Sequence, residues 1–366
     1  MRRGGRDGGA RPVTMRDIAR RLGVSRPAVS AALSGRPSTI GLSDALRERI
    51  RREAGALGYR PNLLARSFIK QRSYLVGFLG RAEYFLYAYE TLSALERALD
   101  PAGVSILSFL HGDTAADQQR HLQRCLDRRA DGLIVAAAAE GARGPMARRV
   151  AGLRRAGFPV VQVYRRIFRD VPVVMTDDEA IGYRATRHLL ELGHRRIVHY
   201  THDAYVDRRN PGQDRDARDR RAGYVRALRE AGLKPAVVTF PTARYFPLDA
   251  GFAPGAREGA PRVASHPARF TAAVCFNDYI ALGLLRGLRQ SGLDVPRDFS
   301  IAGYDDIDLA RASEPPLTTL APPLRRIGEE AARRVLDLIA GRPATDLLFE
   351  PELRVRGTTA PPAGRP

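Results

Sequence analysis

The sequence predicts two modules of different fold class: a small all-α head of three helices at the N-terminus and a larger α/β body. Two short helical patterns, separated by Gly23 and Val24, predict the first part of the head. From Tyr74 onward, short β-rich runs alternate with amphipathic stretches, which predicts a doubly wound body with parallel sheets. With 366 residues, 44% of them hydrophobic, the chain is long enough for two or three domains with cores of their own.

Composition argues against several classes of protein. No apolar run approaches the roughly 18 residues that span a bilayer, and residues 1–12 form an Arg/Gly-rich tail that we expect to be disordered. We therefore expect no membrane association and a cytoplasmic location. The two cysteines, Cys125 and Cys275, lack metal-like spacing and predict neither a disulfide framework nor a zinc site. We expect no metal and no cofactor.

The net charge of +20 is concentrated at the N-terminal end. Residues 1–72 contain 17 Lys and Arg and 5 Asp and Glu, a net +12 that leaves +8 for the remainder. Codon bias would explain the preference for arginine over lysine, but not this concentration. The head is therefore the end that we expect to bind a polyanion.

The two short helices of the head have recognisable start and stop signals. Thr14 is placed to cap the first helix, and Gly23 supplies its left-handed stop. Ser25 begins the second helix, and Pro27 falls in its first turn, where a missing N–H costs nothing. Two short helices joined by a tight turn are the layout of a helix-turn-helix in residues 13–60.

A third helix begins at Ser43 and ends at Gly58, and it closes a three-helix core. It carries an apolar stripe at helical spacing: Leu46, Ile50, Ala54 and Leu57. In the second helix we expect these side chains to face that core: Val29, Ala32 and Leu33.

The remaining face of the second helix is expected to meet the DNA major groove. It presents Arg26, Pro27, Ser30 and Ala31, with Ser25 at the helix start. Arg26 is the one side chain there that can make a bidentate contact to guanine, while the two serines suit phosphate or adaptable base contacts. The alternative for Arg26 is a solvated or phosphate-bound arginine.

Motifs through the head carry a resemblance to a known family. In order they are Thr14-Met15-Arg16-Asp17-Ile18-Ala19, Leu22-Gly23-Val24-Ser25, Ala28-Val29-Ser30, Leu33-Ser34-Gly35 and Leu57-Gly58-Tyr59-Arg60-Pro61-Asn62. This succession resembles the head of the LacI/GalR repressor family, and we place Thr14 in the DNA interface with the reading helix. Two residues depart from the pattern: the family often has a polar or basic residue where Ala31 stands, and Pro27 cannot donate a hydrogen bond. Both departures shift the expected base reading toward Arg26.

The segment that follows, residues 61–72, is too short to form a stable helix by itself. The resemblance implies a hinge helix and linker that folds on operator DNA and pairs with its dimer mate in the minor groove. Asn62, Leu64, Ala65 and Phe68 would then contact DNA, with Phe68 in the wedge position that is normally leucine. The alternative is a plain linker whose Leu64 and Phe68 pack on the body.

The body shows regular alternation of strands and helices. Strands are predicted at 74–79, 104–109, 132–136, 159–163, 197–200, 237–240, 272–276 and 300–303. Helices are predicted at 115–130, 179–192, 218–231 and 279–291. Residues 208–221, rich in alternating charge, and 247–261, rich in Gly and Pro, are predicted as surface insertions.

Polar residues follow several of these strands, and ligands of doubly wound folds lie beyond the carboxyl ends of strands. The groups are Asn277-Asp278, Tyr304-Asp305-Asp306 and Thr176-Asp177-Asp178. Their carboxylates and amides can accept hydroxyl hydrogens of a sugar or nucleoside. The alternative, which we favour for Asp177, Asp278 and Asp306, is that they only cap helices.

Further motifs extend the resemblance to about residue 361. They are Leu192-Gly193-His194-Arg195-Arg196-Ile197, Arg220-Arg221-Ala222-Gly223-Tyr224, Asn277-Asp278, Ala281-Leu282-Gly283, Gly303-Tyr304-Asp305-Asp306 and Pro315-Pro316-Leu317-Thr318-Thr319-Leu320. They are similar to the family's markers in its effector-binding and dimerisation domain, here residues 73–361. The fold so implied is that of periplasmic sugar-binding proteins, with two similar lobes hinged around a cleft.

The resemblance also implies which residues hold the effector. Carried over position by position, they are Arg220, Asn277 and Asp305, and we add Arg165 and Tyr87. The aromatic ring of Tyr87 would stack on a ring of the ligand, or alternatively pack within the lobe.

Two further positions depart from the family's pocket. Pro322 stands where many relatives have a polar contact, and Tyr164 stands where many have aspartate before arginine.

These observations predict a sequence-specific transcriptional regulator, in the family's common mode a repressor. It would bind double-stranded operator DNA with an inverted repeat as a homodimer, under control of a sugar or nucleoside-like effector. Alternatives are an activator, an effector-independent regulator or architectural protein, a transport binding protein, and an enzyme acting on a sugar or nucleoside. No glycine precedes a lysine, and neither G-x-S-x-G nor H-E-x-x-H occurs, which disfavours the enzyme.

Overall fold

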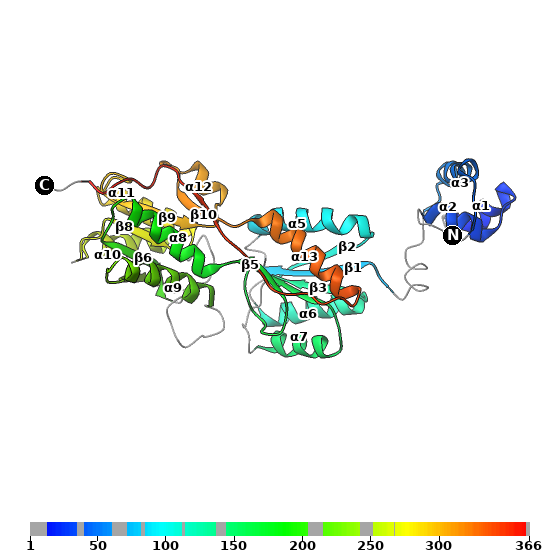
Figure 1. Ribbon diagram of the computed structural model, residues 1–366, viewed down its shortest axis with the longest axis horizontal. Coiled ribbons are helices and arrows are strands. Elements are labelled where there is room, and N and C mark those ends of the chain that lie inside the picture. The colour runs from blue at the N-terminus through cyan, green and yellow to red at the C-terminus, as the bar shows by residue number, and fades with distance from the viewer. Residues whose placement is uncertain are drawn as a thin grey trace, which may run out of the picture. The chain divides into compact units, whose positions relative to one another are not determined.

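The computed structural model describes residues 13–34, 40–60, 72–81, 85–111, 114–136, 144–203, 215–241, 252–266 and 268–363. The chain divides into two compact units, Met1–Gln71 and Arg72–Pro366. Each has a hydrophobic core of its own, and the second contains two sheets (Figure 1). Among the described helices, none is long and apolar enough to cross a lipid bilayer.

The first unit contains three described helices, α1 Met15–Leu22, α2 Arg26–Ser34 and α3 Asp44–Ala56. Their shared core is formed by Ile18, Ala19, Val29, Ala32, Ile50 and Ala54. The inward residues predicted for α2 are confirmed, since Val29 and Ala32 are buried and Leu33 packs against this core. This packing leaves the opposite side of α2 exposed.

The predicted helix signals of the head are also present. The Asp17 carboxylate accepts hydrogen bonds from the Thr14 backbone N–H at 3.0 Å and from the Thr14 hydroxyl at 2.7 Å. Gly23 has φ +67°, the left-handed conformation that ends α1. The Ser25 hydroxyl accepts from the Ala28 N–H at 3.3 Å, and the Ser43 hydroxyl accepts from the Leu46 N–H at 3.3 Å. Local sequence thus fixes where all three helices begin.

The second unit contains two six-stranded sheets. Sheet A has the order β11-β5-β4-β3-β1-β2, with β1 Leu75–Arg81, β2 Ser105–His111, β3 Gly132–Val135, β4 Val160–Val163, β5 Val173–Thr176 and β11 Leu347–Phe349. Sheet B has the order β12-β10-β9-β8-β6-β7, with β6 Ile197–His202, β7 Val237–Phe240, β8 Ala272–Cys275, β9 Ser300–Tyr304, β10 Thr318–Ala321 and β12 Glu352–Arg354. Adjacent strands are parallel except β12, which runs antiparallel to β10.

Helices cover both faces of each sheet (Figure 1). They are α5 Phe85–Leu99, α6 Ala115–Asp127, α7 Pro145–Arg155, α8 Asp178–Glu191, α9 Arg215–Glu230, α10 Ala260–Ala264, α11 Asp278–Gln290, α12 Asp308–Ala312 and α13 Leu324–Ile339, with short turns η2 Asp100–Ala102 and η6 Gly255–Gly259. On sheet A, α5 and α13 pack on one face and α6 and α7 on the other. On sheet B, α8 and α9 cover one face and α10 and α11 the other. The predicted doubly wound body is therefore confirmed.

The chain crosses between the two sheets three times, after β5, after β10 and between β11 and β12. The first and third crossings are joined, because the Asp177 N–H donates to the Phe349 carbonyl at 2.8 Å. Three adjacent crossings are the connections expected of two lobes hinged around a cleft.

All eight predicted strands and all four predicted helices of the body are present, with shifted ends. The pattern did not predict β5, β10, β11 and β12, nor α5, α7, α10, α12 and α13. Strands β11 and β12 have three residues each, too few to show a period. Their pairing partners are supplied by strands far away in the sequence.

Two predicted surface insertions are wrong where the structure describes them. Residues 215–221 belong to α9, and Arg220 there is buried. Residues 255–261 pack against α11, and the Tyr200 hydroxyl donates to the Gly255 carbonyl at 2.7 Å. The small Gly and Ala side chains that resemble a loop in the sequence instead permit close packing of helices. Residues 204–214 and 242–251 lie outside the described residues.

Helices α8 and α9 cross at two glycines, and this crossing positions Arg220. A methyl group at Gly182 would fall on the carbonyl oxygen of Arg220, and one at Gly223 would fall on the carbonyl oxygen of Glu179. Because both obstacles are backbone atoms, neither can rotate away. Glycine is therefore required at these two positions for the helices to approach.

We expect Gly182→Ala and Gly223→Ala each to lower the free energy of unfolding by about 1–3 kcal/mol, the usual cost of overpacking. Gly152→Ala in α7 is the matched control, because an added methyl there meets no atom within 4 Å. That change should be neutral or raise stability by about 0.5–1 kcal/mol. Urea unfolding of the three variants tests this, and equal effects at all three positions would contradict the tight crossing.

Candidate functional site

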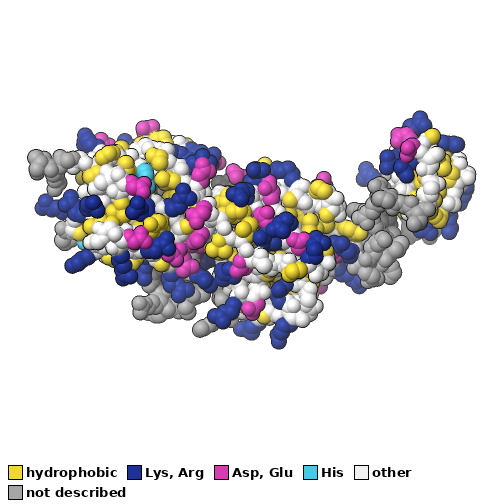
Figure 2. Space-filling view, in the orientation of Figure 1, with side chains coloured by type: hydrophobic (Ala, Val, Ile, Leu, Met, Phe, Trp, Pro, Cys, Tyr) yellow, Lys and Arg dark blue, Asp and Glu magenta, His cyan; other side chains and the backbone are white. Residues whose placement is uncertain are grey.

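The exposed side of α2 carries the residues predicted to read DNA. Arg26, Pro27 and Ser30 are exposed, and Ala31 is half-buried. Arg16, Arg20 and Arg21 of α1 are exposed as well, so that positive charge surrounds α2, as Figure 2 shows for the first unit. A protruding helix with an arginine at its start and a cationic surround suits the major groove of DNA.

Five predicted site residues lie wholly or partly outside the description. Residues 61–71 are outside the described part of the chain, and with them Asn62, Leu64, Ala65 and Phe68. The backbone of Tyr87 is part of α5, but its side chain is not described. Their predicted contacts with DNA and effector stay predictions.

Arg220 is the most constrained of the predicted effector residues. Its Nε donates to Asp178 Oδ1 at 2.8 Å, and its Nη1 donates to the Phe276 carbonyl at 2.8 Å. Its guanidinium carbon lies 4.4 Å from the centre of the Phe276 ring and 4.2 Å from that of Tyr304. Among the described residues, no group accepts a hydrogen bond from Nη2, which is left available for a ligand.

The Arg220–Asp178 pair is buried, with 10% of one side chain and 5% of the other exposed. Burial raises the pKa of Asp178 to about 6, and the Arg220 guanidinium limits that rise. Burial also disfavours the charge of Arg220, but Asp178 outweighs it and keeps the pKa of Arg220 raised. The two groups therefore form a fixed ion pair in which each favours the charged form of the other.

Asp305 follows β9 in a strained conformation. Its φ is +124° and that of Asp306 is +52°, both in the left-handed region that non-glycine residues rarely adopt. Burial raises the pKa of Asp305 well above its usual range, and the nearby Arg220 opposes this rise. No described group donates a hydrogen bond to its carboxylate. A strained acidic residue without a donor is typical of a position that a ligand completes.

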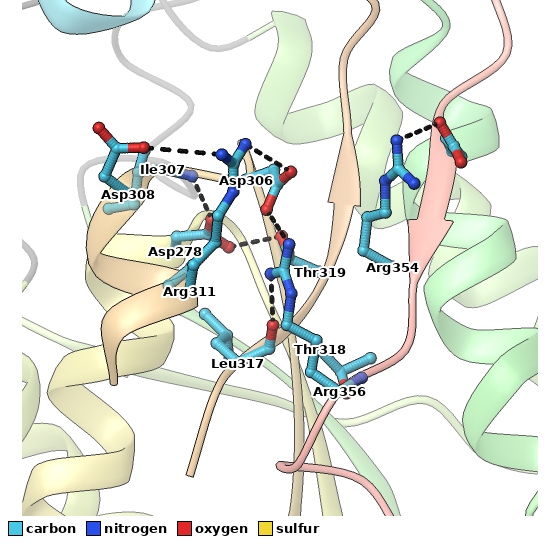
Figure 3. A network of polar contacts seen from close by, with 12 residues as sticks. Asp278, Asp306, Ile307, Asp308, Arg311, Leu317, Thr318, Thr319, Arg354 and Arg356 are labelled. Atoms are coloured by element: carbon cyan, nitrogen blue, oxygen red, sulfur yellow. Dashed lines mark hydrogen bonds and ion pairs between the residues drawn. The ribbon is translucent and has the colours of Figure 1, made fainter. Parts of the chain in front are cut away.

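Figure 3 shows the network that holds this turn. Asp306 forms ion pairs with Arg356 and, at 3.1 Å, with Arg311. Asp278, fully buried, accepts from the Thr319 hydroxyl at 2.6 Å and from the Ile307 N–H at 3.1 Å. The two residues that follow Asp305 are thus held by these contacts, Asp306 by two arginines and Ile307 by Asp278.

Of three aspartates predicted to cap helices, one does so. Asp177 accepts from the N–H groups of Glu179 at 3.0 Å and Ala180 at 3.1 Å, which confirms its role at α8. For Asp278 the prediction is wrong, because Asn277 caps α11. For Asp306 it is also wrong, because its carboxylate is held by two arginines.

The position of Asp278 has a physical reason. A methyl group at Gly303 would clash with its Oδ1, so this glycine lets the carboxylate approach β9. Burial raises the pKa of Asp278 to about 7, while the donors Thr319 and Ile307 oppose the rise.

Asn277 and Arg165 already have partners within the protein. Asn277 Oδ1 accepts from the Ile280 N–H at 3.0 Å, which leaves its amide nitrogen without a described partner. Arg165, after β4, pairs with Asp216 of α9 at 2.9 Å. This ion pair connects the lobe of sheet A with the lobe of sheet B. Arg165 therefore joins the lobes, and its predicted contact with the effector stays a prediction.

A cavity of about 440 Å³ lies beside Asp305. Asp306, Arg311 and Pro322 line it too, whereas Arg220 and Asn277 do not. Pro322 thus occupies a cavity wall, and it offers no hydrogen bond there. Among the five effector residues predicted, the structure brings Arg220, Asp305 and Asn277 to the carboxyl ends of neighbouring strands of sheet B.

Comparisons with known proteins agree with this geometry. Residues 186–359 match the periplasmic binding protein-like domain. The chain is 31% identical to the HTH-type transcriptional regulator MalR of Streptomyces coelicolor, over 95% of this chain and 97% of that protein. It is 29% identical to the HTH-type transcriptional repressor PurR of Vibrio vulnificus, over 94% of this chain and 98% of that protein.

Among solved structures, the lac repressor dimer bound to operator and an anti-inducer is similar, with a TM-score of 0.76. Its sequence is 23% identical, and the alignment covers 96% of this chain and 100% of that chain. The chain belongs to the LacI/GalR family of transcriptional regulators.

As a LacI/GalR regulator, the chain has site residues whose role the sequence pattern did not predict. The sequence placed Asp178 and Tyr304 at strand ends and Phe276 within a strand. It did not predict that all three contact the Arg220 side chain. The signals in the sequence were that Tyr304 belongs to one of the family's markers and that Phe276 directly precedes another, whereas Asp178 lies outside the markers. That three such segments meet on one guanidinium depends on how α8, β8 and β9 pack.

We expect Arg220→Ala to lower the free energy of unfolding by about 3–5 kcal/mol, because the buried Asp178 carboxyl loses its partner and must either stay charged in the interior or take up a proton. The double variant Asp178→Asn/Arg220→Ala should lose less than the sum of the two single variants. Arg297→Ala, which removes an exposed arginine 3.1 Å from Asp298, is the control and should cost at most about 1 kcal/mol. Urea unfolding of the wild type, the two single variants and the double variant gives the double-mutant cycle. Strictly additive losses of unfolding free energy would contradict the buried ion pair.

Proposed function

We propose that this LacI/GalR regulator represses transcription in the cytoplasm, as a homodimer on double-stranded operator DNA with an inverted repeat. A sugar or nucleoside-like effector, held between the two lobes of the second unit, controls its binding. The observation that carries this proposal is that Arg220 Nη2 and the Asp305 carboxylate, near the carboxyl ends of β8 and β9, each lack a described hydrogen-bond partner while the rest of the Arg220 guanidinium is held in place.

The DNA-reading part of the proposal rests on α2. One reading helix per chain and the closed symmetry usual among oligomers favour two half-sites related by a two-fold axis. Within α2, Arg26 is exposed and can reach guanine O6 and N7 with two donors. Ser25, with its hydroxyl already used at the helix start, and Ser30 suit phosphate contacts.

Residues 61–72 form the connection through which an effector would act on DNA. We propose that they fold into a hinge helix in the minor groove, where Asn62, Leu64 and Ala65 contact the duplex and Phe68 is the wedge. An apolar wedge unstacks a base step at a cost of a few kcal/mol and bends the duplex. A phenyl ring in place of the family's usual leucine offers more surface to stack on a base.

The effector part of the proposal rests on donors and acceptors. Arg220 Nη2 and the Asn277 amide nitrogen donate, and the Asp305 carboxylate accepts, which suits vicinal hydroxyls or the edge of a base. The aromatic residues Phe276 and Tyr304 are occupied by Arg220, so a ligand ring would need another aromatic partner, for which we propose Tyr87. The Arg165–Asp216 pair, which joins the lobes, is the contact that a change of lobe angle would strain first.

The operator is to be isolated by selecting fragments of the host genome that bind the wild-type protein. We expect one inverted repeat in these fragments, protected over both half-sites. Arg26→Ala should weaken binding to the operator by about 1–3 kcal/mol and relax the preference for guanine, because the bidentate hydrogen bonds to the base are removed.

Arg20→Ala is the control for Arg26, because Arg20 is an exposed arginine of α1 rather than of the reading helix α2. The Arg20→Ala substitution should weaken binding to operator DNA and to unrelated DNA to the same degree. If Arg26→Ala also weakened binding to both DNAs equally, Arg26 would contact phosphate rather than a base. A DNA footprint that protects a single half-site would contradict the homodimer.

We expect Asp305→Asn to leave operator binding unchanged and to blunt the effector response. Asparagine tolerates a positive φ, so the turn should be retained. Loss of a charge-assisted hydrogen bond of about 1.5–3 kcal/mol should raise the half-maximal effector concentration by about 10-fold or more. Gel-shift titrations with a panel of sugars, nucleosides and bases measure this half-maximal concentration.

Glu352→Gln is the matched control, because Glu352 lines the same cavity but is paired with Arg354 at 2.8 Å. It should respond like wild type. A normal response from Asp305→Asn to the compound that wild type recognises would show that the effector site lies elsewhere.

A further inference from the structure

The two faces of sheet A carry different charge. Helices α5 and α13 on one face contain five arginines, Arg97, Arg325, Arg326, Arg333 and Arg334, and five acidic residues, Glu90, Glu96, Glu329, Glu330 and Asp337. On the other face, α6 with the two residues after it and α7 contain eight arginines, Arg120, Arg124, Arg128, Arg129, Arg148, Arg149, Arg154 and Arg155, but two aspartates, Asp117 and Asp127. One face is neutral and the other strongly basic.

The two faces also differ in how many of their arginines form ion pairs. On α13, Arg325, Arg333 and Arg334 each pair with an acidic residue of the same helix. On α6 and α7, these arginines form no ion pair with a described residue: Arg124, Arg128, Arg129, Arg154 and Arg155. Since both faces belong to the same Arg-rich chain, codon bias does not explain the difference.

The arginines of α6 and α7 form one continuous surface. Arg120, Arg124 and Arg128 recur every four residues, so that they form an exposed stripe along α6. Arg148 and Arg155, seven residues apart, are exposed on α7. The two helices are joined where Arg149 Nη2 donates to Gln123 Oε1 at 2.7 Å.

We call this surface the basic face; it comprises Arg120, Arg124, Arg128, Arg129, Arg148 and Arg155. Figure 2 shows Lys and Arg side chains along the lower edge of the lobe, where Figure 1 places α7.

The basic face begins where the chain enters the second unit. Asp131, four residues after the end of α6, accepts from the N–H groups of Ser73 at 2.8 Å and Tyr74 at 2.9 Å, and pairs with Arg72. Eleven residues, 61–71, separate this point from residue 60 of the head. Fully extended they span at most about 40 Å. The length of the connection therefore limits how far DNA held by the head can lie from this end of the lobe.

We propose that the basic face binds the phosphate backbone of duplex DNA that flanks the sequence read by α2. The inference rests on the proposed DNA binding of the head, which brings a polyanion close to the lobe. Arginines on a helical surface bind backbone phosphates without regard to sequence. Helix macrodipoles account for arginines at the C-terminal ends of α6 and α7, and Asp117 pairs with Arg120, but neither accounts for Arg148 in the first half of α7.

The test compares three full-length proteins on a random-sequence duplex of about 60 base pairs, long enough to extend beyond the head. They are wild type, the face variant Arg124→Gln/Arg128→Gln/Arg129→Gln/Arg155→Gln, and the control variant Arg195→Gln/Arg196→Gln/Arg229→Gln/Arg257→Gln. The control removes the same charge from exposed arginines around sheet B. Fluorescence anisotropy at several salt concentrations gives the slope of log Kobs against log salt. Thermal unfolding shows whether each variant retains the fold.

For the face variant we expect a shallower slope, by about 0.9 for each phosphate that is no longer neutralised and up to about 3.6 for four. The control variant should keep the wild-type slope. Equal slopes for all three proteins would overturn the proposal. Equal reductions in both variants would also overturn it, because they would show an effect of net charge alone.

Failure of this inference is distinguishable from failure of the proposed function. The proposed function fails when the wild-type protein selects no preferred sequence from genomic DNA, whatever the salt slopes are. The inference fails when wild type binds DNA but the face variant binds with the same salt slope. Absence of any DNA binding by wild type overturns both.

Discussion

The candidate effector site depends on one buried ion pair, between Arg220 and Asp178. Removing two charges from water is costly, and it is offset only when the geometry is good and the remaining donors are satisfied. Here the guanidinium also donates to the Phe276 carbonyl and lies against two aromatic rings. These contacts leave Arg220 little freedom, so the one donor without a described partner points in a fixed direction.

This ion pair in turn requires the close crossing of α8 and α9. Asp178 begins α8, and Arg220 lies within α9. Gly182 and Gly223 allow the two backbones to touch, and a larger residue at either position would move one partner away from the other. Packing of small residues thus controls the electrostatics of the site.

A second constraint is the strained turn at Asp305 and Asp306. Two successive residues with positive φ persist only where the surroundings hold them. Asp306 forms ion pairs with two arginines, and Asp278 accepts a hydrogen bond from the N–H of Ile307. The Asp305 carboxylate is thereby presented beside Arg220 before any ligand arrives, which limits the entropy that binding must overcome.

The sequence by itself determined the helix-turn-helix, because its signals are local. Each signal depends only on neighbours in the chain. These signals are the caps at Thr14 and Ser43, the left-handed conformation of Gly23 and the apolar repeat of 3.6 residues. It also determined the alternation of strands and helices in the body, and the resemblance identified Arg220, Asn277 and Asp305 as a group. Strands such as β11 and β12 could not be predicted, because three residues acquire strand structure only from a partner.

Tertiary structure alone decided which of these residues still have free donors and acceptors. Arg165 and Asn277 were expected at the ligand, but a salt bridge holds the first and a helix start uses the Asn277 oxygen. Asp278 and Asp306 were expected to cap helices, but they brace the turn of Asp305 instead. The physical reason is that hydrogen bonds and ion pairs act over about 3–4 Å between side chains from separate elements. The amino-acid sequence supplies the polar groups, and only packing decides which of them meet.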